Sequence, residues 1–454
     1  MDSECNIRDY LVPGRHAHLV GIGGVSMRPL GLVLKGIGMV ITGSDMNSSV
    51  STEELQEKGI EVHIGHSAEH IKGAECIIRT AAVHNDNPEI AAARAQGIPV
   101  FERAQAWGVI MQHYQNAICI SGTHGKTTTT SMVTHIFLEA GKDPTVMIGG
   151  KLPILGAGHR VGQGDDIILE SCEYCNSFLN FFPTTAVVLN VEEDHLDFFK
   201  DLDDIKASFR KFAELVPENG HILVNGEDTN AMDALQGLPM ITFGMHPGFD
   251  VYADHISDDF RSMDIIADGK KYCHLNLKVI GSHNACNAAA AAAVAWVHGI
   301  PAEAVERGLA AFHGADRRMQ YKGTVNGAEI YDDYAHHPSE LQATIHTARL
   351  MKPKRLIVVF QPHTYSRTKT LFEEFVSALQ PADLCLLAEI YAAREQNTIG
   401  ISSRDLQKRI EGSVFFRTLP QIAEYLSSLI QPGDMVITVG AGDIYQGADM
   451  LVKQ

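Results

Sequence analysis

Short apolar runs alternate with segments of helical length along the whole chain, and this alternation limits the folds open to it. Near the start, the apolar segment His18–Val20 is followed by a glycine turn, a helical-period segment near Met27–Ile37 and the apolar run Met39–Ile41, which leads to Asp45. Apolar runs of four to eight residues separated by helices are typical of parallel strands buried on both faces. The pattern predicts an α/β fold built from β-α-β units.

The chain is also too long for one hydrophobic core, so we expect several domains. The strand-to-helix pattern restarts at Ala117–Ile120 and again after Arg317-Arg318. We therefore predict a Rossmann-like domain at 1–112, a central domain with a mostly parallel sheet at 113–316 and a Rossmann-like domain at 317–454. Strands predicted in the last domain lie near Thr324–Tyr331, Leu356–Phe360, Leu384–Leu387 and Met435–Val439.

The charge balance excludes some classes of partner. A formal net charge of −18 disfavours binding to nucleic acid or to an anionic membrane, because both need clustered Lys and Arg. Residues 1–15 contain no apolar stretch suited to a signal peptide, and the apolar run Ala288–Val297 is too short to span a bilayer. We expect a cytoplasmic protein whose eight cysteines are mostly reduced and buried.

A glycine loop, Gly122-Thr123-His124-Gly125-Lys126-Thr127, follows the apolar strand Ala117–Ile120 and opens a helix predicted from about Thr127 to Ala140. Such a loop points backbone N–H groups and the helix dipole at one spot, which suits a polyphosphate. Lys126 would reach the β- and γ-phosphates of ATP, and the Thr127 hydroxyl would bind Mg²⁺. The spacing, G-x-x-G-K-T, is shorter than the Walker A motif. The alternative is a lysine on an ordinary strand-to-helix turn. The loop predicts a P-loop ATPase-like central domain.

A second glycine loop, Gly21-Ile22-Gly23-Gly24, follows the first strand, and Asp45 comes about twenty residues later. Glycines and an acid at this spacing suit a dinucleotide such as NAD. However, Ser26 occupies the position of the third glycine of G-x-G-x-x-G. This substitution weakens the NAD interpretation and leaves other nucleotides open.

Transfer of a γ-phosphoryl group needs charge neutralisation near Lys126. Glu173 and His195 follow the apolar strands Ile167–Leu169 and Ala186–Leu189, so we expect both at the carboxyl edge of the sheet, where ligands bind. The neighbouring pair Cys172 and Cys175 could indicate a redox or zinc site, but the sequence contains no second CxxC. Glu173 and His195 are therefore the predicted metal ligands, together with Thr127.

The run Ile120–Thr130 resembles the signature of the Mur ligases, and further motifs of that family follow in order along nearly the full length. They are Gly21–Gly24, Asn190–His195, Gly281–Asn287, Arg317-Arg318, Asp332–Pro338 and Phe360–His363. The resemblance is strongest to the branch that joins L-alanine to the lactyl carboxylate of UDP-N-acetylmuramate in peptidoglycan precursor synthesis. It implies ATP-dependent amide formation through an acyl phosphate, with ADP and phosphate as products and Mg²⁺ as cofactor. We expect a monomer or weak homodimer.

The resemblance implies roles for individual residues. The residues expected to bind the nucleotide sugar are Gly21, Gly23, Gly24, Asp45, Arg103 and the loop residues His66 and His84. The residues expected to bind ATP are Gly122, Thr123, His124, Gly125, Lys126, Thr127, Thr128, His283, Asn284, Asn287, Arg318 and Asp333. The amino acid is expected near Tyr334, His363 and Arg367. The catalytic candidates are Lys126, His336 and His337. Asn284 could instead simply cap its helix. Thr364 stands where the family commonly has arginine, and Cys172 and Cys175 stand where acids are common.

Three alternatives remain open. A sister ligase would add another amino acid or a peptide to the same nucleotide sugar. A nucleotide-dependent switch would use the loop at Gly122–Thr127 without amide chemistry. An NAD-dependent oxidoreductase would rest on Gly21–Gly24 and Asp45 alone.

Overall fold

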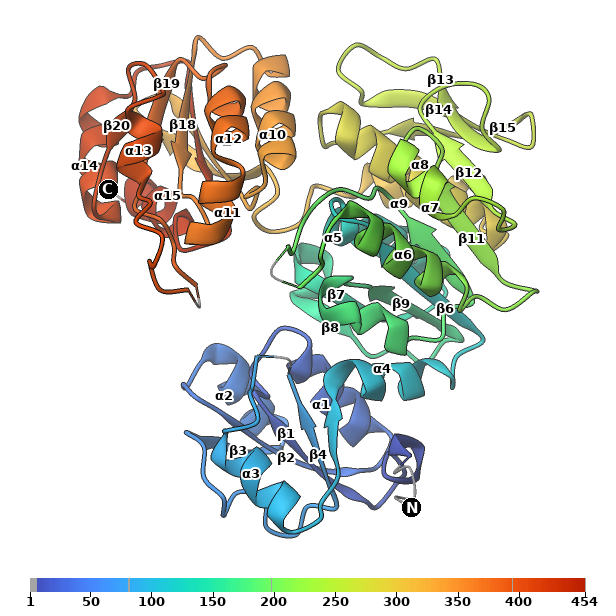
Figure 1. Cartoon of the computed structure of the whole chain (residues 1–454). Helices are drawn as coiled ribbons and strands as arrows, with labels where there is room; N and C mark the ends of the chain where they lie inside the picture. Colours follow the sequence, from blue (N-terminus) through green and yellow to red (C-terminus); the bar gives the residue numbers. More distant parts are fainter. Residues whose placement is uncertain (1–5, 81, 197, 394, 454) are drawn as a thin grey trace. The chain divides into compact units, whose positions relative to one another are not determined.

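The computed structural model of the protein describes residues 6–80, 82–196, 198–393 and 395–453, and within them the strands form three sheets flanked by helices (Figure 1). The described residues group into two compact units. One contains the residues up to His255 together with 263–275 and 286–311, and the other contains 256–262, 276–285 and those from Phe312 onward. The predicted α/β class with mostly parallel sheets is confirmed.

The first sheet is parallel throughout and has the strand order β3-β2-β1-β4-β5. Its strands are β1 (His16–Val20), β2 (Val40–Asp45), β3 (Glu61–Ile64), β4 (Cys76–Arg79) and β5 (Val100–Glu102). Its helical segments are η1 (Ile7–Asp9), α1 (Met27–Gly36), α2 (Val50–Glu57), α3 (Pro88–Ala95) and α4 (Arg103–Met111). The order places β1 centrally, so the predicted strand, helix and strand before Asp45 form one β-α-β unit.

The second sheet has the order β15-β14-β13-β12-β11-β10-β6-β9-β7-β8 and is parallel from β13 to β7. Its strands are β6 (Asn116–Ser121), β7 (Thr145–Leu152), β8 (Ala157–Arg160), β9 (Asp166–Glu170), β10 (Thr185–Val188), β11 (His221–Asn225), β12 (Ile241–Gly244), β13 (Val251–Asp254), β14 (Ser262–Ala267) and β15 (Lys270–Asn276). Its helical segments are α5 (Lys126–Glu139), η2 (Pro153–Leu155), η3 (Tyr174–Asn180), α6 (Leu202–Ala213), α7 (Thr229–Ala234), α8 (Ser282–Val297) and α9 (Ala302–Ala310). The neighbours β9, β6 and β10 bring their carboxyl ends to one edge.

The third sheet has the order β16-β17-β21-β18-β19-β20. Its strands are β16 (Gln320–Val325), β17 (Ala328–Asp333), β18 (Arg355–Phe360), β19 (Leu384–Leu387), β20 (Val414–Phe415) and β21 (Asp434–Val439). Its helices are α10 (Pro338–Leu350), α11 (Tyr365–Thr370), α12 (Phe372–Leu379), α13 (Ser403–Gln407), α14 (Leu419–Leu429) and α15 (Tyr445–Val452). The single strand predicted near Thr324–Tyr331 is wrong. This segment is part of the β16–β17 hairpin, because Asn326 and Gly327 both adopt positive φ and turn the chain.

Helix α5 is buried along most of its length although it is rich in threonine. Three of its hydroxyl groups donate to carbonyls one turn earlier, those of Thr130, Ser131 and Thr134, at 2.8, 2.7 and 2.7 Å, whereas the buried Thr129 hydroxyl has no hydrogen-bond partner within the described residues. These bonds let a polar sequence pass through the interior, because a buried hydroxyl without a partner would be costly.

No disulfide joins cysteines within the described residues, and Cys76, Cys119, Cys273 and Cys385 are buried while Cys172 and Cys286 are partly buried. Cys175 is exposed, which departs from the expected burial, and Cys5 lies outside the described residues. Among the described residues, the search for a helix long and apolar enough to cross a membrane finds none.

Candidate active site

The loop Gly122–Thr127, which is predicted to bind phosphate and is called the phosphate loop, joins β6 to α5. Gly122 and Gly125 adopt φ values of 143° and 83°, which L side chains rarely adopt. A Cβ atom on Gly125 would also lie 2.6 Å from Oδ1 of Asn287 in α8. Space and backbone conformation both require glycine at Gly125, which is the N-cap of α5. The loop therefore lies where the helix presents its first N–H groups.

Lys126 bridges the loop and an acid from the next strand connection. Its Nζ donates to the carbonyls of Gly122 and Thr123 and lies 3.0 Å from Oε2 of Glu173. Burial alone would lower the pKa of Lys126, but the acidic groups around it, Glu173 first and then Cys172 and Glu170, together raise it further than burial lowers it. The lysine is therefore held as an ammonium ion at the mouth of the loop.

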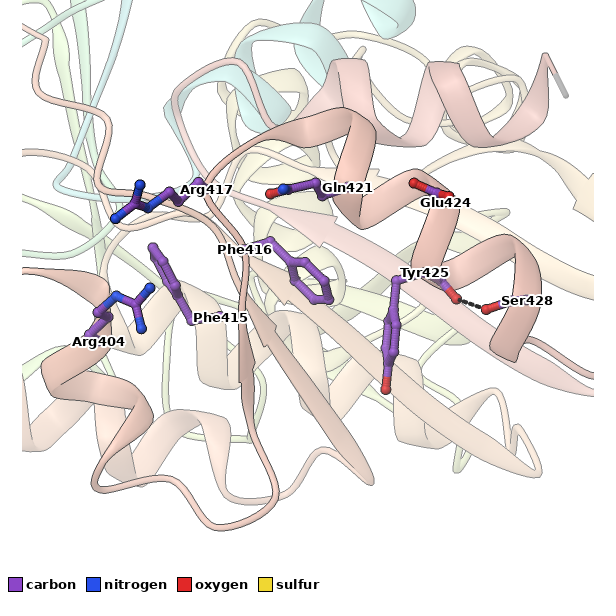
Figure 2. A pocket seen from close by; sticks show the side chains of 8 residues that line it. All are labelled: Arg404, Phe415, Phe416, Arg417, Gln421, Glu424, Tyr425 and Ser428. Carbon is purple, nitrogen blue, oxygen red and sulfur yellow. Dashed lines mark hydrogen bonds between the residues drawn. The ribbon is translucent and has the colours of Figure 1, made fainter.

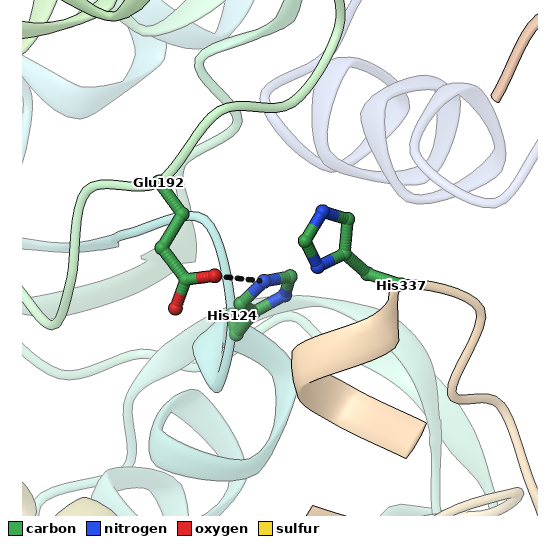
Figure 3. Close-up of side chains that lie close together, drawn as sticks. All are labelled: His124, Glu192 and His337. Carbon is green, nitrogen blue, oxygen red and sulfur yellow. Dashed lines mark ion pairs between the residues drawn. The ribbon is translucent and has the colours of Figure 1, made fainter. Parts of the chain in front are cut away.

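The loop is fixed from the β10 side by Asn190. The His124 N–H donates to Oδ1 of Asn190 at 2.7 Å, and the Asn190 amide donates to the His124 carbonyl at 3.1 Å. The His124 imidazole faces Glu192, with 3.4 Å between Nε2 and Oε2 (Figure 3). These contacts tie the end of β10 to the phosphate loop.

Thr127 and Glu170 form a second polar pair beside the loop. The Thr127 hydroxyl donates to the Glu170 carboxylate at 3.0 Å, and this carboxylate also accepts the Gly149 N–H at 2.6 Å. Glu170 ends β9 at the sheet edge that carries the loop. Thr127 thus has a carboxylate partner that the sequence analysis did not single out.

Glu173 and His195 meet, as predicted, but a cysteine joins them. The ligand atoms of Cys172, Glu173 and His195 all lie within 4.8 Å of one another. The His195 Nε2 and Glu173 Oε1 atoms are 3.7 Å apart, and the His195 ring lies 4.6 Å from the ring of Tyr174. His195 adopts a φ of 55°, a strained conformation for a non-glycine residue. Burial, aided by the Glu173 charge, raises the pKa of the Cys172 thiol to about 12.

The amino-terminal glycine loop is held by Asp45. The Gly23 N–H donates to Oδ2 of Asp45 at 2.9 Å, and Gly21 adopts a φ of 81°. Arg103 begins α4 and is partly buried, whereas His84 is exposed. The structure therefore joins Gly23 to Asp45 directly and leaves the His84 side chain at the surface.

His66 belongs to a buried network centred on Glu89, a residue the sequence analysis did not single out. The fully buried Glu89 carboxylate accepts bonds from Ser44 at 2.6 Å, His70 at 2.8 Å and His66 at 3.0 Å, and lies 3.7 Å from His18. Burial raises the pKa of Glu89, but the interaction with His18 and the hydrogen bonds from Ser44 and His70 together outweigh it and bring the pKa to about 2. The network holds Ser44, next to Asp45, in place.

Arg317 and Arg318 differ in their surroundings. Arg317 bonds the buried Asp332 at 3.0 Å and the Gly440 carbonyl at 2.6 Å, and its guanidinium lies over the rings of Tyr334 and Tyr445. Arg318 makes a longer ion pair, 3.8 Å, with Glu340. Arg317 is thus built into the carboxy-terminal fold, and Arg318 is the less constrained of the two.

The loop after β17 is organised by a buried acid. Asp333 accepts the N–H groups of Met319 at 2.7 Å and Ala335 at 2.8 Å, and burial raises its pKa to about 6. His337 is the N-cap of α10 and forms a capping box with Glu340. The hydrogen bonds of Asp333 and the capping box of His337 therefore fix the backbone of this loop.

Four predicted residues of this region lie close together. The His336 ring lies 5.5 Å from Tyr334 and 5.8 Å from His363, and Nη1 of Arg367 lies 3.4 Å from Nδ1 of His363.

His283, at the start of α8, is near Arg318, and burial, followed by the Arg318 charge, lowers the pKa of His283 to about 4. Asn284 donates to the Ile280 carbonyl at 2.9 Å, a bond within its own turn.

A separate surface pocket lies between β20 and α14 (Figure 2). Its lining residues are Arg404, Phe415, Phe416, Arg417, Gln421, Glu424, Tyr425 and Ser428. None of these belongs to the set predicted from sequence, so the pocket is not part of the candidate site.

Comparison with known proteins tests the resemblance. Three family models match in chain order: the Mur ligase family catalytic domain at 16–115, the Mur ligase middle domain at 120–295 and the Mur ligase glutamate ligase domain at 317–442. A UDP-N-acetylmuramate--L-alanine ligase of Caldicellulosiruptor saccharolyticus is 43% identical over 96% of this chain and 98% of its own length. The chain belongs to the Mur ligase family.

Other similar proteins also support membership of the Mur ligase family. A protein of the same name from Agathobacter rectalis is 45% identical over 96% of this chain and 98% of its own. The crystal structure of a UDP-N-acetylmuramate-alanine ligase from Thermotoga maritima superposes with a TM-score of 0.81 at 27% identity, covering 96% of this chain and 98% of that one.

The adjacent arginines of this Mur ligase give a paired prediction. Arg317→Ala leaves the buried Asp332 carboxylate unpaired, so we expect the carboxy-terminal unit to lose about 3 kcal/mol of stability. Arg318→Ala should cost less than about 1 kcal/mol, because its ion pair is long and partly exposed, yet it should raise the KM for ATP. Thermal unfolding and ATP kinetics of both variants check this. Equal loss of stability in the two would contradict it.

Proposed function

We propose that this protein is an ATP-dependent ligase that joins L-alanine to the lactyl carboxylate of UDP-N-acetylmuramate, a step of peptidoglycan precursor synthesis. The observation that carries the proposal is the 43–45% identity, over nearly the whole chain, to relatives named for this reaction. The phosphate loop, with Lys126 held as an ammonium ion, agrees with it.

The proposed reaction has two steps. A carboxylate oxygen attacks the γ-phosphorus of ATP, the bond to the ADP oxygen breaks, and an acyl phosphate forms. The amino nitrogen of L-alanine then attacks the acyl carbon, phosphate leaves with the bonding electron pair, and the amine loses a proton. Lys126 would stabilise the charge on the transferred phosphoryl group. His336 and His337 are the candidates near the amine.

The residues around the loop suit a magnesium ion in part. The Thr127 hydroxyl and the Glu170 and Glu173 carboxylates are oxygen donors, which Mg²⁺ prefers. Bound Mg²⁺ would neutralise phosphate charge. We propose that Thr127, Glu173 and His195 hold it, with Glu170 orienting the Thr127 hydroxyl. The Cys172 thiol beside them is a poor magnesium ligand.

We further propose the division of labour among the domains. Residues 1–112 would bind the UDP-sugar through Gly21, Gly23, Gly24 and Asp45, residues 113–316 would bind ATP, and residues 317–454 would bind the amino acid. Its partners would be these small molecules, without nucleic acid or membrane, in the cytoplasm, and the protein would be a monomer or weak homodimer.

The reaction is tested by measuring phosphate release from ATP with UDP-N-acetylmuramate and a panel of L-alanine, glycine, L-serine and D-glutamate. We expect release to need both the sugar nucleotide and the amino acid, with L-alanine the best acceptor. UDP-N-acetylglucosamine, which lacks the lactyl carboxylate, is the matched control and should give none. Preference for another acceptor would identify a sister ligase, and release independent of the sugar nucleotide would indicate a nucleotide switch.

A further inference from the structure

A buried carboxylate lies behind residues that are expected to bind the nucleotide sugar. Glu89 is fully buried, and its two oxygens are the shared hydrogen-bond partners of three side chains from other segments. One oxygen bonds Ser44 of β2 and His66, which follows β3, and the other bonds His70. Glu89 therefore acts on this part of the domain through its neighbours and does not reach the surface itself.

The hydrogen bonds of Glu89 determine which atoms carry protons. Although burial raises the pKa of Glu89, its partners bring it to about 2, so the carboxylate is ionised at neutral pH and can only accept. The Ser44 hydroxyl gives its one proton to Glu89 at 2.6 Å, so its oxygen can only accept from Nδ1 of His66, 3.1 Å away. Two acceptors therefore require a proton on Nδ1 of His66.

A proton on Nδ1 leaves Nε2 of His66 as the accepting nitrogen of the neutral ring. Within the described residues, Nε2 forms no hydrogen bond and is not one of the buried side-chain atoms that lack a partner. The side chain keeps 10% of its surface exposed. His66 thus presents a hydrogen-bond acceptor to solvent while its other nitrogen is anchored to Glu89.

This acceptor belongs to the same sheet edge as Asp45, the last residue of β2. The N–H of Gly65, one residue before His66, donates to the Asp45 carbonyl at 2.8 Å, and Asp45 pairs with Ile64 of β3. An acid at the end of the second strand of such a domain commonly accepts a ribose hydroxyl of a bound nucleotide. The Asp45 carboxylate and Nε2 of His66 therefore offer two acceptors, which suit the two neighbouring hydroxyls of a ribose.

We propose that Glu89 is a positioning residue for binding of the nucleotide sugar. It holds His66 in the tautomer with its proton on Nδ1, so that Nε2 accepts a hydrogen bond from one ribose hydroxyl while Asp45 accepts from the other. The identity of the ligand rests on the proposed function, but the tautomer of His66 does not.

The tautomer is measured on the full chain with nitrogen-15-labelled histidine at about pH 8, above the ordinary pKa of histidine. The nitrogen-15 shifts of an imidazole distinguish a nitrogen that carries hydrogen from a bare one. We expect hydrogen on Nδ1 of His66 and a bare Nε2, and the His66 signals are those absent from the spectrum of His66→Asn. Hydrogen on Nε2 would overturn the inference.

The ligand contact is tested by calorimetric binding of UDP, 2′-deoxy-UDP and 3′-deoxy-UDP to the full chain. The parent should bind UDP about tenfold more tightly than the analogue that lacks the hydroxyl bonded to His66. His66→Asn keeps an N–H group for Glu89 but lacks the outer acceptor, and Glu89→Leu removes the carboxylate that orients the ring. Both variants should bind UDP and that analogue alike.

His70→Phe is the matched control. It removes a hydrogen bond to the same carboxylate but keeps a ring to pack on His63, whose centroid lies 4.2 Å away, so it should retain the tenfold preference. Thermal unfolding shows which variants are folded. A general loss of stability would weaken the binding of UDP and its analogues equally, so the preference reports positioning.

The inference fails if the parent binds both deoxy analogues as tightly as UDP, or if folded Glu89→Leu keeps the preference. If Glu89→Leu does not fold, the tautomer in the parent and the binding by His66→Asn decide. A protein with the expected tautomer and preference but no ligase activity would refute only the proposed reaction. An active ligase without the preference would refute only the role of Glu89 and His66.

Discussion

Lys126→Ala is expected to lower phosphate release in the complete ligase assay about a thousandfold, the scale seen when a preorganised charge at a transition state is removed. The structure holds Nζ at the mouth of the loop through the Gly122 and Thr123 carbonyls and the Glu173 carboxylate, so the ammonium charge already lies beside the loop where phosphate charge would develop. Initial rates with saturating ATP, UDP-N-acetylmuramate and L-alanine measure the effect.

The matched control for this variant is Lys142→Ala. Lys142 is exposed beyond the carboxyl end of α5, the helix that Lys126 begins, and its loss should leave the rate unchanged. Lys126→Ala also leaves the Glu173 carboxylate without its ammonium partner, so it could affect folding as well as catalysis. Lys126→Met, which keeps the aliphatic stem, is therefore measured too, and thermal unfolding of both variants separates the two effects. A rate within tenfold of the parent would exclude Lys126 from phosphoryl transfer.

Glu89→Ala is expected to cost the amino-terminal domain about 3–5 kcal/mol, the range for breaking a buried ionic network. The variant leaves Ser44, His66 and His70 without the carboxylate that accepts their hydrogen bonds. Because a multidomain protein need not unfold in one step, the midpoint of the transition that includes this domain is the quantity to compare. Glu75→Ala removes an exposed ion pair with Arg15, which solvent screens, and should leave that midpoint almost unchanged.

The same network predicts how stability depends on pH. The folded pKa of Glu89, about 2, lies below its ordinary value of 4.5, so its contribution is complete above pH 4.5 and is lost as the pH falls towards 2. Burial lowers the pKa of His18 from 6.5, so protonation of the unfolded chain also removes stability as the pH falls below 6.5. Glu89→Ala should flatten the acid side of the unfolding profile. A profile parallel to that of the parent below pH 4.5 would argue against a charged Glu89.

Fold class and the phosphate loop could be read from sequence because both are local patterns. The strand predicted at Leu384–Leu387 matches the observed bounds of β19, and the helix predicted from about Thr127 begins at Lys126. Apolar runs and glycines report backbone conformation within a few residues. The hairpin turn at Asn326-Gly327 is equally local, since an Asn-Gly pair is itself a sequence signal for such a turn. The domain boundaries and the ligand roles of individual residues remain predictions.

The partners of the charged side chains were not predictable in this way. Glu170 meets Thr127 across 43 positions, and His124 is tied to Asn190 across 66, because parallel strands join distant segments at one sheet edge. Glu89 and its histidines come from separate strands and loops for the same reason.

The sequence by itself determined that this chain is an α/β Mur ligase with a glycine loop at Gly122–Thr127 that opens a helix, because periodicity and motif spacing are properties of neighbouring residues. Only the tertiary structure decided that Arg317 is a structural residue and that Cys172 joins Glu173 and His195. Those outcomes depend on which side chains share one small volume, and chain order does not specify it.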